Sequence, residues 1–308
     1  MTPEVRAELQ RIGAELDGHR QVRVKTGGIV TPDTTPNVET KETANVERQA
    51  KARSAAGSRT GAASRQGSAG RSRSPGPAAH VRRDDLRACY EAQVVELQQA
   101  YPSAQVVASD AQGMWLRVES AVLDGIDRSV TFLVAVPYTR GSHPRAWAFW
   151  NLPAGPQWIG RRHTNFPDGS VCAYVPQSGT WAEGGRLDSL IDLYSVWALR
   201  QLHLEVFGRW PGRQDSSHPF YSLVEFKDDE LCSCEAHDPP LRYGQCCKPE
   251  HLRRGFMQLK ADFERTQRVR ITDRNPPPSV IEYVEGRGDL PAISQVVSAL
   301  PRGAAART

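Results

Sequence analysis

Residues 163–172 bring a thiol, an amide and an imidazole into one short stretch, which reads His-Thr-Asn-Phe-Pro-Asp-Gly-Ser-Val-Cys. The Pro-Asp-Gly at 167–169 predicts a turn, because proline presets φ, aspartate bonds back to the backbone and glycine accepts a positive φ. Such a turn folds the stretch back on itself, so that Cys172 begins an extended segment opposite His163 and Asn165. The sequence therefore predicts a site at which these three side chains meet.

A cysteine that accepts and passes on an acyl group needs access to solvent, and its thioester is attacked through an oxyanion that needs a hydrogen-bond donor. Cys172 is the candidate nucleophile and the Asn165 amide the candidate donor. We interpret His163 mainly as a hydrogen bonder that shapes the loop, since an imidazole acting as base would indicate a thiol hydrolase. The structural alternative is that Cys172 is a small buried hydrophobic residue and His163 a satisfied core residue.

This pattern resembles the active-site segment of ubiquitin-conjugating enzymes, in which His-Pro-Asn precedes a glycine-containing turn and the thioester-forming cysteine. Thr164 stands where the family has proline, and the interval from Asn165 to Cys172 is slightly shorter. Both departures fit the divergent bacterial relatives, which also carry a downstream Trp, a Gly-x-Trp-Pro-Gly stretch and a His. The matching residues here are Trp181, Gly208-Arg209-Trp210-Pro211-Gly212 and His218. The resemblance covers roughly residues 84–226.

The resemblance implies a ubiquitin-conjugating (UBC-like) fold and a thioester carrier, which accepts an activated modifier or acyl group on Cys172 and transfers it to an amine. Asn165 would support the oxyanion and His163 would hold the loop. The implied partners are a ubiquitin-activating-like adenylating enzyme and either a ubiquitin-like modifier or a signalling nucleotidyltransferase target, in bacterial antiviral defence. Two alternatives stay open: a catalytically inactive scaffold or binding module of the same fold, and a Cys-His hydrolase that removes modifiers.

Periodicity along the chain predicts an α+β protein in the order of that fold. Apolar spacing typical of helices occurs over 3–17, from 84 to the proline at 102, and over 187–207, with Gly208 placed to end the last helix. Alternating or apolar runs bounded by turns predict strands over 105–109, 114–122, 129–137 and 145–150. We expect a four-stranded antiparallel meander followed by a long irregular active-site loop. Trp181, Trp197 and Trp210 are expected to be core or loop anchors.

Composition divides the 308 residues into parts. The predicted parts are an N-terminal amphipathic helix (1–26), a disordered Ser/Gly/Arg-rich linker (27–81), a UBC-like catalytic domain (82–226), a zinc knuckle (227–252), and a helix with a flexible tail (253–308). The linker has almost no large apolar residues with which to offset its chain entropy. Whether the N-terminal helix docks elsewhere or packs on the core stays open.

The charge and hydropathy of the sequence limit the partners and the cellular compartment that we expect. The net charge of +4 comes largely from arginines spread through the linker, which lacks aromatics for base stacking, so we expect a solvated linker rather than a nucleic-acid contact. No apolar run approaches the ~20 residues that span a bilayer. With six cysteines and no apolar leader segment, we expect a cytoplasmic protein without a membrane anchor.

A second group of cysteines predicts a metal site. Cys232, Cys234, Cys246 and Cys247 can surround one tetrahedral Zn²⁺ at ~2.3 Å each, and a knuckle of this size would fold because the metal ties it. The spacing resembles the short SEC-C type zinc motif, with a longer interval between Cys234 and Cys246. His237 or His251 is therefore an alternative ligand. Two disulfides are the competing interpretation, which a reducing compartment disfavours. With no ligand position left open, the zinc would be structural.

Overall fold

The computed structural model describes residues 1–18, 22–25, 27–32, 83–174, 180–212, 214, 218–232, 234, 236–267, 269–271 and 274–297. Within these residues the chain is α+β, as predicted, with helices and antiparallel sheets. Residues 33–81, which are most of the predicted disordered linker, lie outside the described part.

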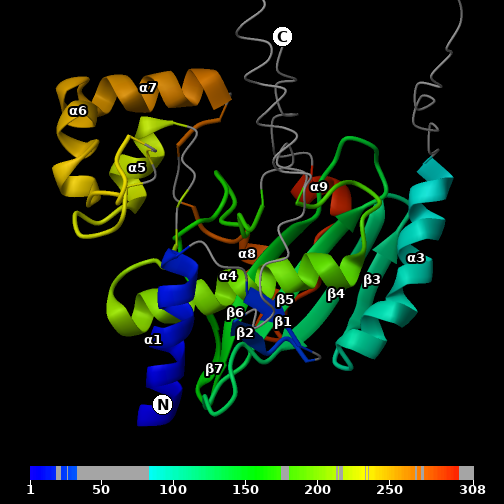
Figure 1. Cartoon of the computed structure of the whole chain (residues 1–308). Helices are drawn as coiled ribbons and strands as arrows, with labels where there is room; N and C mark the ends of the chain where they lie inside the picture. Colours follow the sequence, from blue (N-terminus) through cyan, green and yellow to red (C-terminus); the bar gives the residue numbers. More distant parts are fainter. Residues whose placement is uncertain are drawn as a thin grey trace, which may run out of the picture. The chain divides into compact units, whose positions relative to one another are not determined.

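The main sheet of the described residues is an antiparallel meander in which each strand pairs with its neighbours along the chain (Figure 1). Its strands are β3 (Gln105–Asp110), β4 (Gly113–Ser120), β5 (Val130–Pro137), β6 (Arg145–Leu152) and β7 (Gly155–Trp158). The four predicted strands are confirmed, but the prediction of a four-stranded sheet was wrong because β7 adds a fifth. A strand that contains Gly and Pro at its start has no alternation by which to recognise it.

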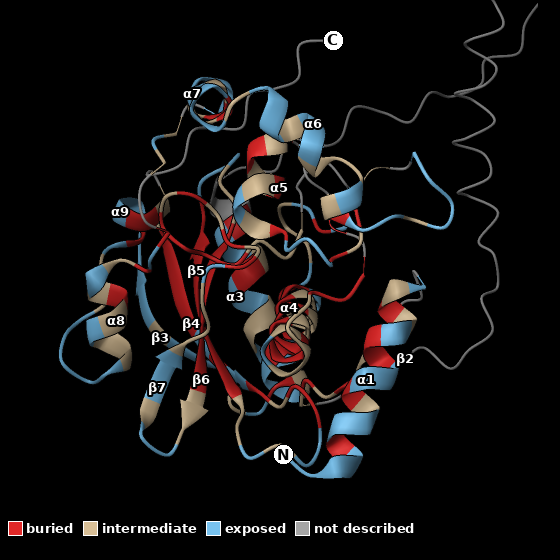
Figure 2. Ribbon diagram, turned by 90° about the vertical axis from the view of Figure 1, so that its left-hand side faces the viewer, coloured by how far each residue is buried: buried red, intermediate tan, exposed pale blue. Residues whose placement is uncertain are grey.

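The middle of the sheet is covered on both faces, and its flanks are open. β5 is buried along its whole length, which explains its nearly continuous apolar run. β3 is largely exposed and carries an irregularity between Val106 and Ala108, a common way to protect a sheet edge. The same contrast between the buried middle strands and the exposed flanks is visible in Figure 2.

One face of the sheet is covered by the long helix α4 (Leu187–Phe207), the predicted helix after the active-site loop (Figure 1). It ends as predicted at Gly208, which has a φ of 73°. Helix α3 (Arg83–Ala100) packs beside α4. The main apolar core lies between these helices and the sheet. Among its fully buried side chains are Tyr90, Phe132, Val134, Leu190, Ile191 and Tyr194.

The other face is covered by the C-terminal part of the chain. Helices α8 (Pro278–Val284) and α9 (Ile293–Val297) bury Val280 and Ile293 against Trp115 and Leu133 of the sheet. Trp115 also donates its Nε1–H to the carbonyl of Pro291 at 2.9 Å. For 253–308 we predicted one helix with a flexible tail, and the two short helices within 278–297 were not predicted; they form because the sheet offers them an apolar face to bury.

The N-terminal helix packs on the core, which settles the question that the sequence left open. In α1 (Pro3–Asp17) the predicted apolar stripe is buried, and its members are Val5, Leu9, Ile12 and Leu16. A small hairpin of β1 (Val22–Val24) and β2 (Val30–Pro32) follows it. Residues 27–32 were predicted to belong to the disordered linker, but Val30 is fully buried in the same core and pairs with Val24.

A second layer of short helices follows α4. They are α5 (Pro219–Glu225), the 3₁₀ helix η2 (Tyr243–Gln245), α6 (Lys248–Arg253) and α7 (Phe256–Gln267). The helix predicted within 253–308 begins only after Gly255, which adopts a φ of 79° between α6 and α7. Leu259 and Phe263 of α7 are buried against Phe166 and Phe220. Nowhere among the described residues is a helix both long and apolar enough to cross a membrane.

Candidate functional site

The predicted hairpin around residues 163–172 is present. Thr164 and Val171 form an antiparallel bridge, and the backbone N–H of Cys172 donates to the carbonyl of His163 at 2.9 Å. The carbonyl of His163 also accepts the Nε1–H of Trp197 from α4, at 2.9 Å. The hairpin thus lies beside α4, with Cys172 directly paired to His163.

The tip of the hairpin is fixed by a buried ion pair that the sequence did not indicate. Asp168 accepts from Arg145 Nη1 at 2.6 Å, and the two side chains are 9 % and 5 % exposed. The backbone carbonyl of Asp168 accepts from Trp147 Nε1 at 2.8 Å. Because Arg145 and Trp147 both lie on β6, the turn is anchored to the sheet. Sequence reasoning identified Asp168 as a turn former only, since its partners lie on another strand.

Gly169 allows a second segment to approach the same turn. Its φ is 65°, and a Cβ atom at this position would lie 3.0 Å from the backbone of Asn275. Only glycine combines this backbone conformation with so close an approach. The turn is therefore enclosed by the sheet on one side and by the chain just before α8 on the other.

The Asn165 amide is engaged inside the hairpin. Its Nδ2 donates to Ser170 Oγ at 3.2 Å and to the backbone carbonyl of Val171 at 3.1 Å. An amide nitrogen has two hydrogens, so both are used. Asn165 closes the hairpin in this arrangement, and it would have to release one of these bonds to reach an oxyanion. The predicted oxyanion role stays a prediction.

The contacts of the His163 imidazole do not suit a role as general base. Its Nε2 lies 2.8 Å from Gln214 Oε1, and its ring packs against Trp210 with the centroids 4.4 Å apart. Burial lowers the pKa of His163 to about 4, although Glu225 acts in the opposite direction. Among the described residues no hydrogen bond joins this imidazole to the Cys172 thiol. A hydrolase needs such a pair, so the geometry gives that alternative no support.

Cys172 is half-buried, whereas acyl transfer calls for an accessible thiol. Burial, together with a smaller effect of the nearby Glu225 carboxylate, raises its pKa to about 11. Arg274 and Arg145 act in the opposite direction. The thiol is consequently protonated at neutral pH in this arrangement. Three tyrosines also lie within electrostatic reach of it, namely Tyr174, Tyr194 and Tyr221.

The motif residues downstream of Cys172 support the scaffold around the hairpin. Trp181, Trp197 and Trp210 are buried, as predicted for anchors. Gly212, at the end of the Trp-Pro-Gly stretch, donates its backbone N–H to Asp17 Oδ1 of α1 at 2.8 Å. His218 accepts from the backbone N–H of Phe220 at 3.1 Å and so caps α5. These residues position elements and do not approach the thiol through any bond described.

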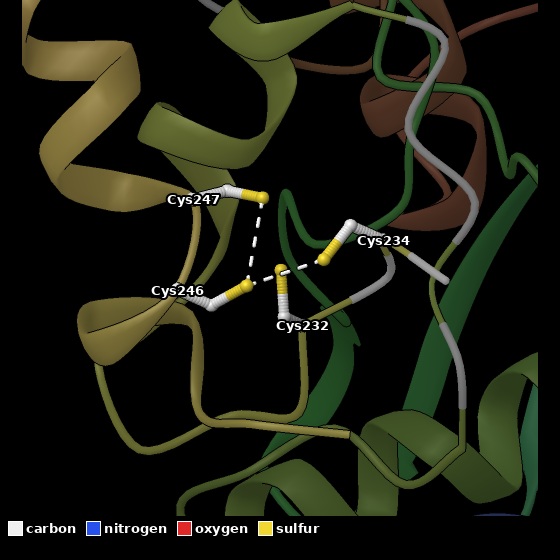
Figure 3. Close-up of side chains that lie close together, drawn as sticks. All are labelled: Cys232, Cys234, Cys246 and Cys247. Carbon is white, nitrogen blue, oxygen red and sulfur yellow. Dashed lines mark hydrogen bonds between the residues drawn. The ribbon is translucent and has the colours of Figure 1, made fainter. Parts of the chain in front are cut away.

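The four cysteines predicted as a metal site come together (Figure 3). Their sulfur atoms all lie within 4.8 Å of one another. The Sγ atoms of Cys234 and Cys246 are 3.2 Å apart, and those of Cys246 and Cys247 are 3.7 Å apart. Sulfurs that surround a tetrahedral zinc at ~2.3 Å would be separated by about 3.8 Å, so the donor set fits a zinc ion.

Two loops deliver these sulfurs. Cys232 and Cys234 follow α5, and the backbone N–H of Cys232 donates to the carbonyl of Leu241 at 2.8 Å. Cys246 and Cys247 lie between η2 and α6. Neither His237 nor His251 belongs to the group, and His251 Nδ1 is instead 3.0 Å from the hydroxyl of Tyr243. The alternative histidine ligand therefore finds no support in the geometry.

Comparison with known proteins adds no relative from which a function can be carried over. No protein-family model, curated protein or solved structure matches this chain. The arrangement of the hairpin and of the cysteine cluster is thus the basis on which a function has to be argued.

Proposed function

We propose that this chain is a thioester carrier of the ubiquitin-conjugating type, with Cys172 as the acyl acceptor. The observation that carries the proposal is the hairpin that pairs the Asn165 limb with the Cys172 limb. It lies after an antiparallel meander and before a helix laid across that sheet, which is the element order that the resemblance implies. The UBC-like fold is part of the same proposal.

The proposed chemistry has two steps. The Cys172 sulfur, after losing its proton, would attack the acyl carbon of a partner's thioester; a new C–S bond forms, and the partner's sulfur leaves and takes up a proton. An acceptor amine would then attack the Cys172 thioester, so that a C–N bond forms, the C–S bond breaks and the amine proton is released. Asn165 would donate to the oxyanion of this second step. His163 holds the loop through its backbone.

The partners follow from the resemblance. A ubiquitin-activating-like adenylating enzyme would supply the activated acyl group, which is the C-terminus of a ubiquitin-like modifier. The acceptor would be a protein amine, and a signalling nucleotidyltransferase of an antiviral defence system is one such target class.

One observation favours a second function, a catalytically inactive binding module. A pKa of about 11 leaves only on the order of one Cys172 thiol in a thousand ionised at pH 8. A thiol in that state is a weak nucleophile unless a partner changes its surroundings. The carrier remains the better-supported function, because a binding module has no need for a thiol at position 172 of the hairpin.

We further propose that the four cysteines hold a structural zinc. Four thiolates complete a tetrahedral site, so the ion would supply folding energy to the knuckle rather than a reactive position. Cys232 and Tyr243 form a small apolar cluster with Phe226 just after α5, so the metal would stabilise the layer that carries Glu225.

An adduct assay tests the carrier function. The protein is mixed with a candidate adenylating enzyme, a ubiquitin-like modifier and ATP, and adducts are resolved with and without a thiol reductant. We expect a reductant-sensitive adduct on the wild-type chain and none on Cys172→Ala. Cys89→Ala is the matched control, because Cys89 is a half-buried free cysteine outside the metal group.

An adduct that survives Cys172→Ala would show that the acceptor was wrongly assigned. No adduct on any form, with the same activating enzyme charging a known carrier, would favour the binding module. Cleavage of a preformed conjugate would instead indicate the hydrolase.

A further inference from the structure

A residue beyond the region of resemblance reaches back to the candidate hairpin. Arg274, which lies between α7 and α8, donates from Nη1 to the backbone carbonyl of Thr164 at 3.3 Å, 110 positions earlier in the chain. Its guanidinium also lies over the Phe166 ring, with Cζ 4.5 Å from the ring centroid. Both contacts are with the limb that precedes the turn. Arg274 therefore holds the hairpin limb that pairs with Cys172.

The same arginine forms an ion pair with Glu225, the last residue of α5, and the two side chains are only 8 % and 4 % exposed. Oε2 of Glu225 accepts from the backbone N–H of His163 at 3.3 Å. The carbonyl of His163 in turn accepts from the backbone N–H of Cys172. Glu225 thus touches the residue paired with Cys172, and it brings a negative charge close to the thiol. Arg274 is the cation that forms an ion pair with this carboxylate.

We propose that Arg274 is a positioning residue for Cys172, which holds the hairpin and neutralises Glu225 so that the thiol can ionise. The purpose of that ionisation, acyl transfer by Cys172, rests on the proposed function. Thiol reactivity can be measured without any modifier or partner, however, so the role of Arg274 is tested separately from acyl transfer.

The charges around the thiol come from several elements. The groups that face Cys172 are Arg145 on β6, Tyr194 on α4, Tyr221 and Glu225 on α5, Arg274 before α8, and Tyr174 on the same limb. Glu225 raises the pKa of the thiol, and the two arginines lower it. Arg145 is already paired with Asp168 at the hairpin tip. Removing the charge of Arg274 would therefore leave Glu225 without its ion-pair partner near the thiol, with only the more weakly placed Arg162 still acting on that carboxylate.

The rate of alkylation of Cys172 by iodoacetamide, followed by mass spectrometry of its peptide across pH, measures this effect. Below the thiol pKa the rate falls about tenfold for each unit by which the pKa rises. We expect Arg274→Gln to react severalfold more slowly than wild type and to shift the pH profile upward. The double variant Arg274→Gln/Glu225→Gln should recover most of the rate, since two amides restore a neutral, hydrogen-bonded pair.

Arg128→Gln is the matched control. Arg128 also pairs with a glutamate, Glu205, and lies over an aromatic ring, that of Trp150, at 4.5 Å. It is not among the groups that face Cys172, so this variant should keep the wild-type profile.

A purely structural role would give the opposite result. If Arg274 only packed the hairpin, Arg274→Gln would expose the thiol and speed alkylation at every pH, and Glu225→Gln would not reverse the change; either finding overturns the proposal. If Arg274→Gln does not fold, Glu225→Gln alone decides, because the proposal requires its profile to shift to lower pH. If no modifier adduct forms but the alkylation profiles of Cys172 are as expected, the carrier function is excluded. The role of Arg274 then still stands.

Discussion

At the scale of single residues, Asn165 separates the two steps of the proposed reaction. Replacing it with Ala removes two donors, to Ser170 and to the carbonyl of Val171. We expect Asn165→Ala to accept the acyl group on Cys172 and to pass it to an amine ~10² to 10³-fold more slowly, the usual effect of losing one oxyanion donor. Single-turnover discharge of the preformed thioester to a free amine measures the second step alone.

Asn151→Ala is the control for Asn165→Ala. Asn151 accepts from Thr131 at 2.9 Å and donates to Ser129 at 2.8 Å, so it too holds neighbouring backbone segments together without facing the thiol. It should discharge at the wild-type rate. Equal discharge rates for Asn165→Ala and wild type would exclude Asn165 from the oxyanion site and leave it as the residue that closes the hairpin.

The local part of the site could be predicted from sequence, and the distant part could not. Pro167, Asp168 and Gly169 specify a turn by their own conformational preferences, and a turn at that point pairs His163 with Cys172. The charges that act on the thiol come from Glu225, Arg274 and Arg145, which no short-range pattern connects to the hairpin. The thiol is less accessible than we expected for the same reason, since its burial depends on which other elements pack around the hairpin.

At the scale of elements, the junction between α1 and the turn after α4 depends on one carboxylate. Asp17 pairs with Arg209 and accepts the backbone N–H of Gly212 at 2.8 Å. We expect Asp17→Ala to lower the free energy of unfolding by about 1–3 kcal/mol, because a partly buried arginine and an amide N–H lose their acceptor. Denaturant unfolding gives the free energy, and limited proteolysis within 1–18 reports on α1 itself.

Glu8→Ala is the comparison within the same helix. Glu8 pairs with Arg11 on the exposed side of α1, and exposed pairs of this kind contribute about 0.5 kcal/mol or less. A loss of stability for Asp17→Ala no larger than that for Glu8→Ala would mean that the apolar stripe of α1 holds the helix in place and that the carboxylate is dispensable.

Long periodic elements were predicted well, and short ones were missed. The stripes of α1 and α4 extend over several turns, so their period is unambiguous. The hairpin of β1 and β2 has strands of three residues, too short for alternation. Its signal was Gly27-Gly28 between apolar residues, a common hairpin connection. Both glycines have positive φ, and a Cβ on Gly28 would lie 1.8 Å from Ser120 Oγ.

At the scale of the whole molecule, the part after residue 226 is where the sequence was least informative. The prediction of a cysteine knuckle is confirmed as a cluster of four sulfurs, because cysteine spacing alone limits where the thiols can lie. The burial of α8 and α9 against the second face of the sheet was not predicted, since five or seven residues carry too little apolar pattern. Those same helices anchor the segment from which Arg274 reaches the hairpin.

Removing the metal tests whether the core stays folded when the knuckle loosens. We expect the purified chain to carry about one zinc ion and a strong chelator to loosen residues 227–252. The core should stay folded, because its apolar cluster of α1, α3, α4 and the sheet shares no residue with the cluster of Phe226, Cys232 and Tyr243. Elemental analysis measures the first point, and limited proteolysis with and without chelator measures the second.

One set of contacts could couple the knuckle to the hairpin, and the chelator experiment would reveal that coupling. Glu230, two residues before Cys232, pairs with Arg162 and accepts from Gln214 Nε2 at 2.7 Å, and Gln214 contacts His163. Since Glu230 is fully buried with these partners, we expect it to stay in place when the sulfurs lose their metal, and the alkylation profile of Cys172 to be unchanged. A chelator that altered this profile would make the knuckle part of the site, because the Glu230–Gln214 contact would then transmit its loosening to His163. Absence of metal, with all four thiols freely alkylated in the native chain, would leave the knuckle as a loop held by its apolar contacts alone.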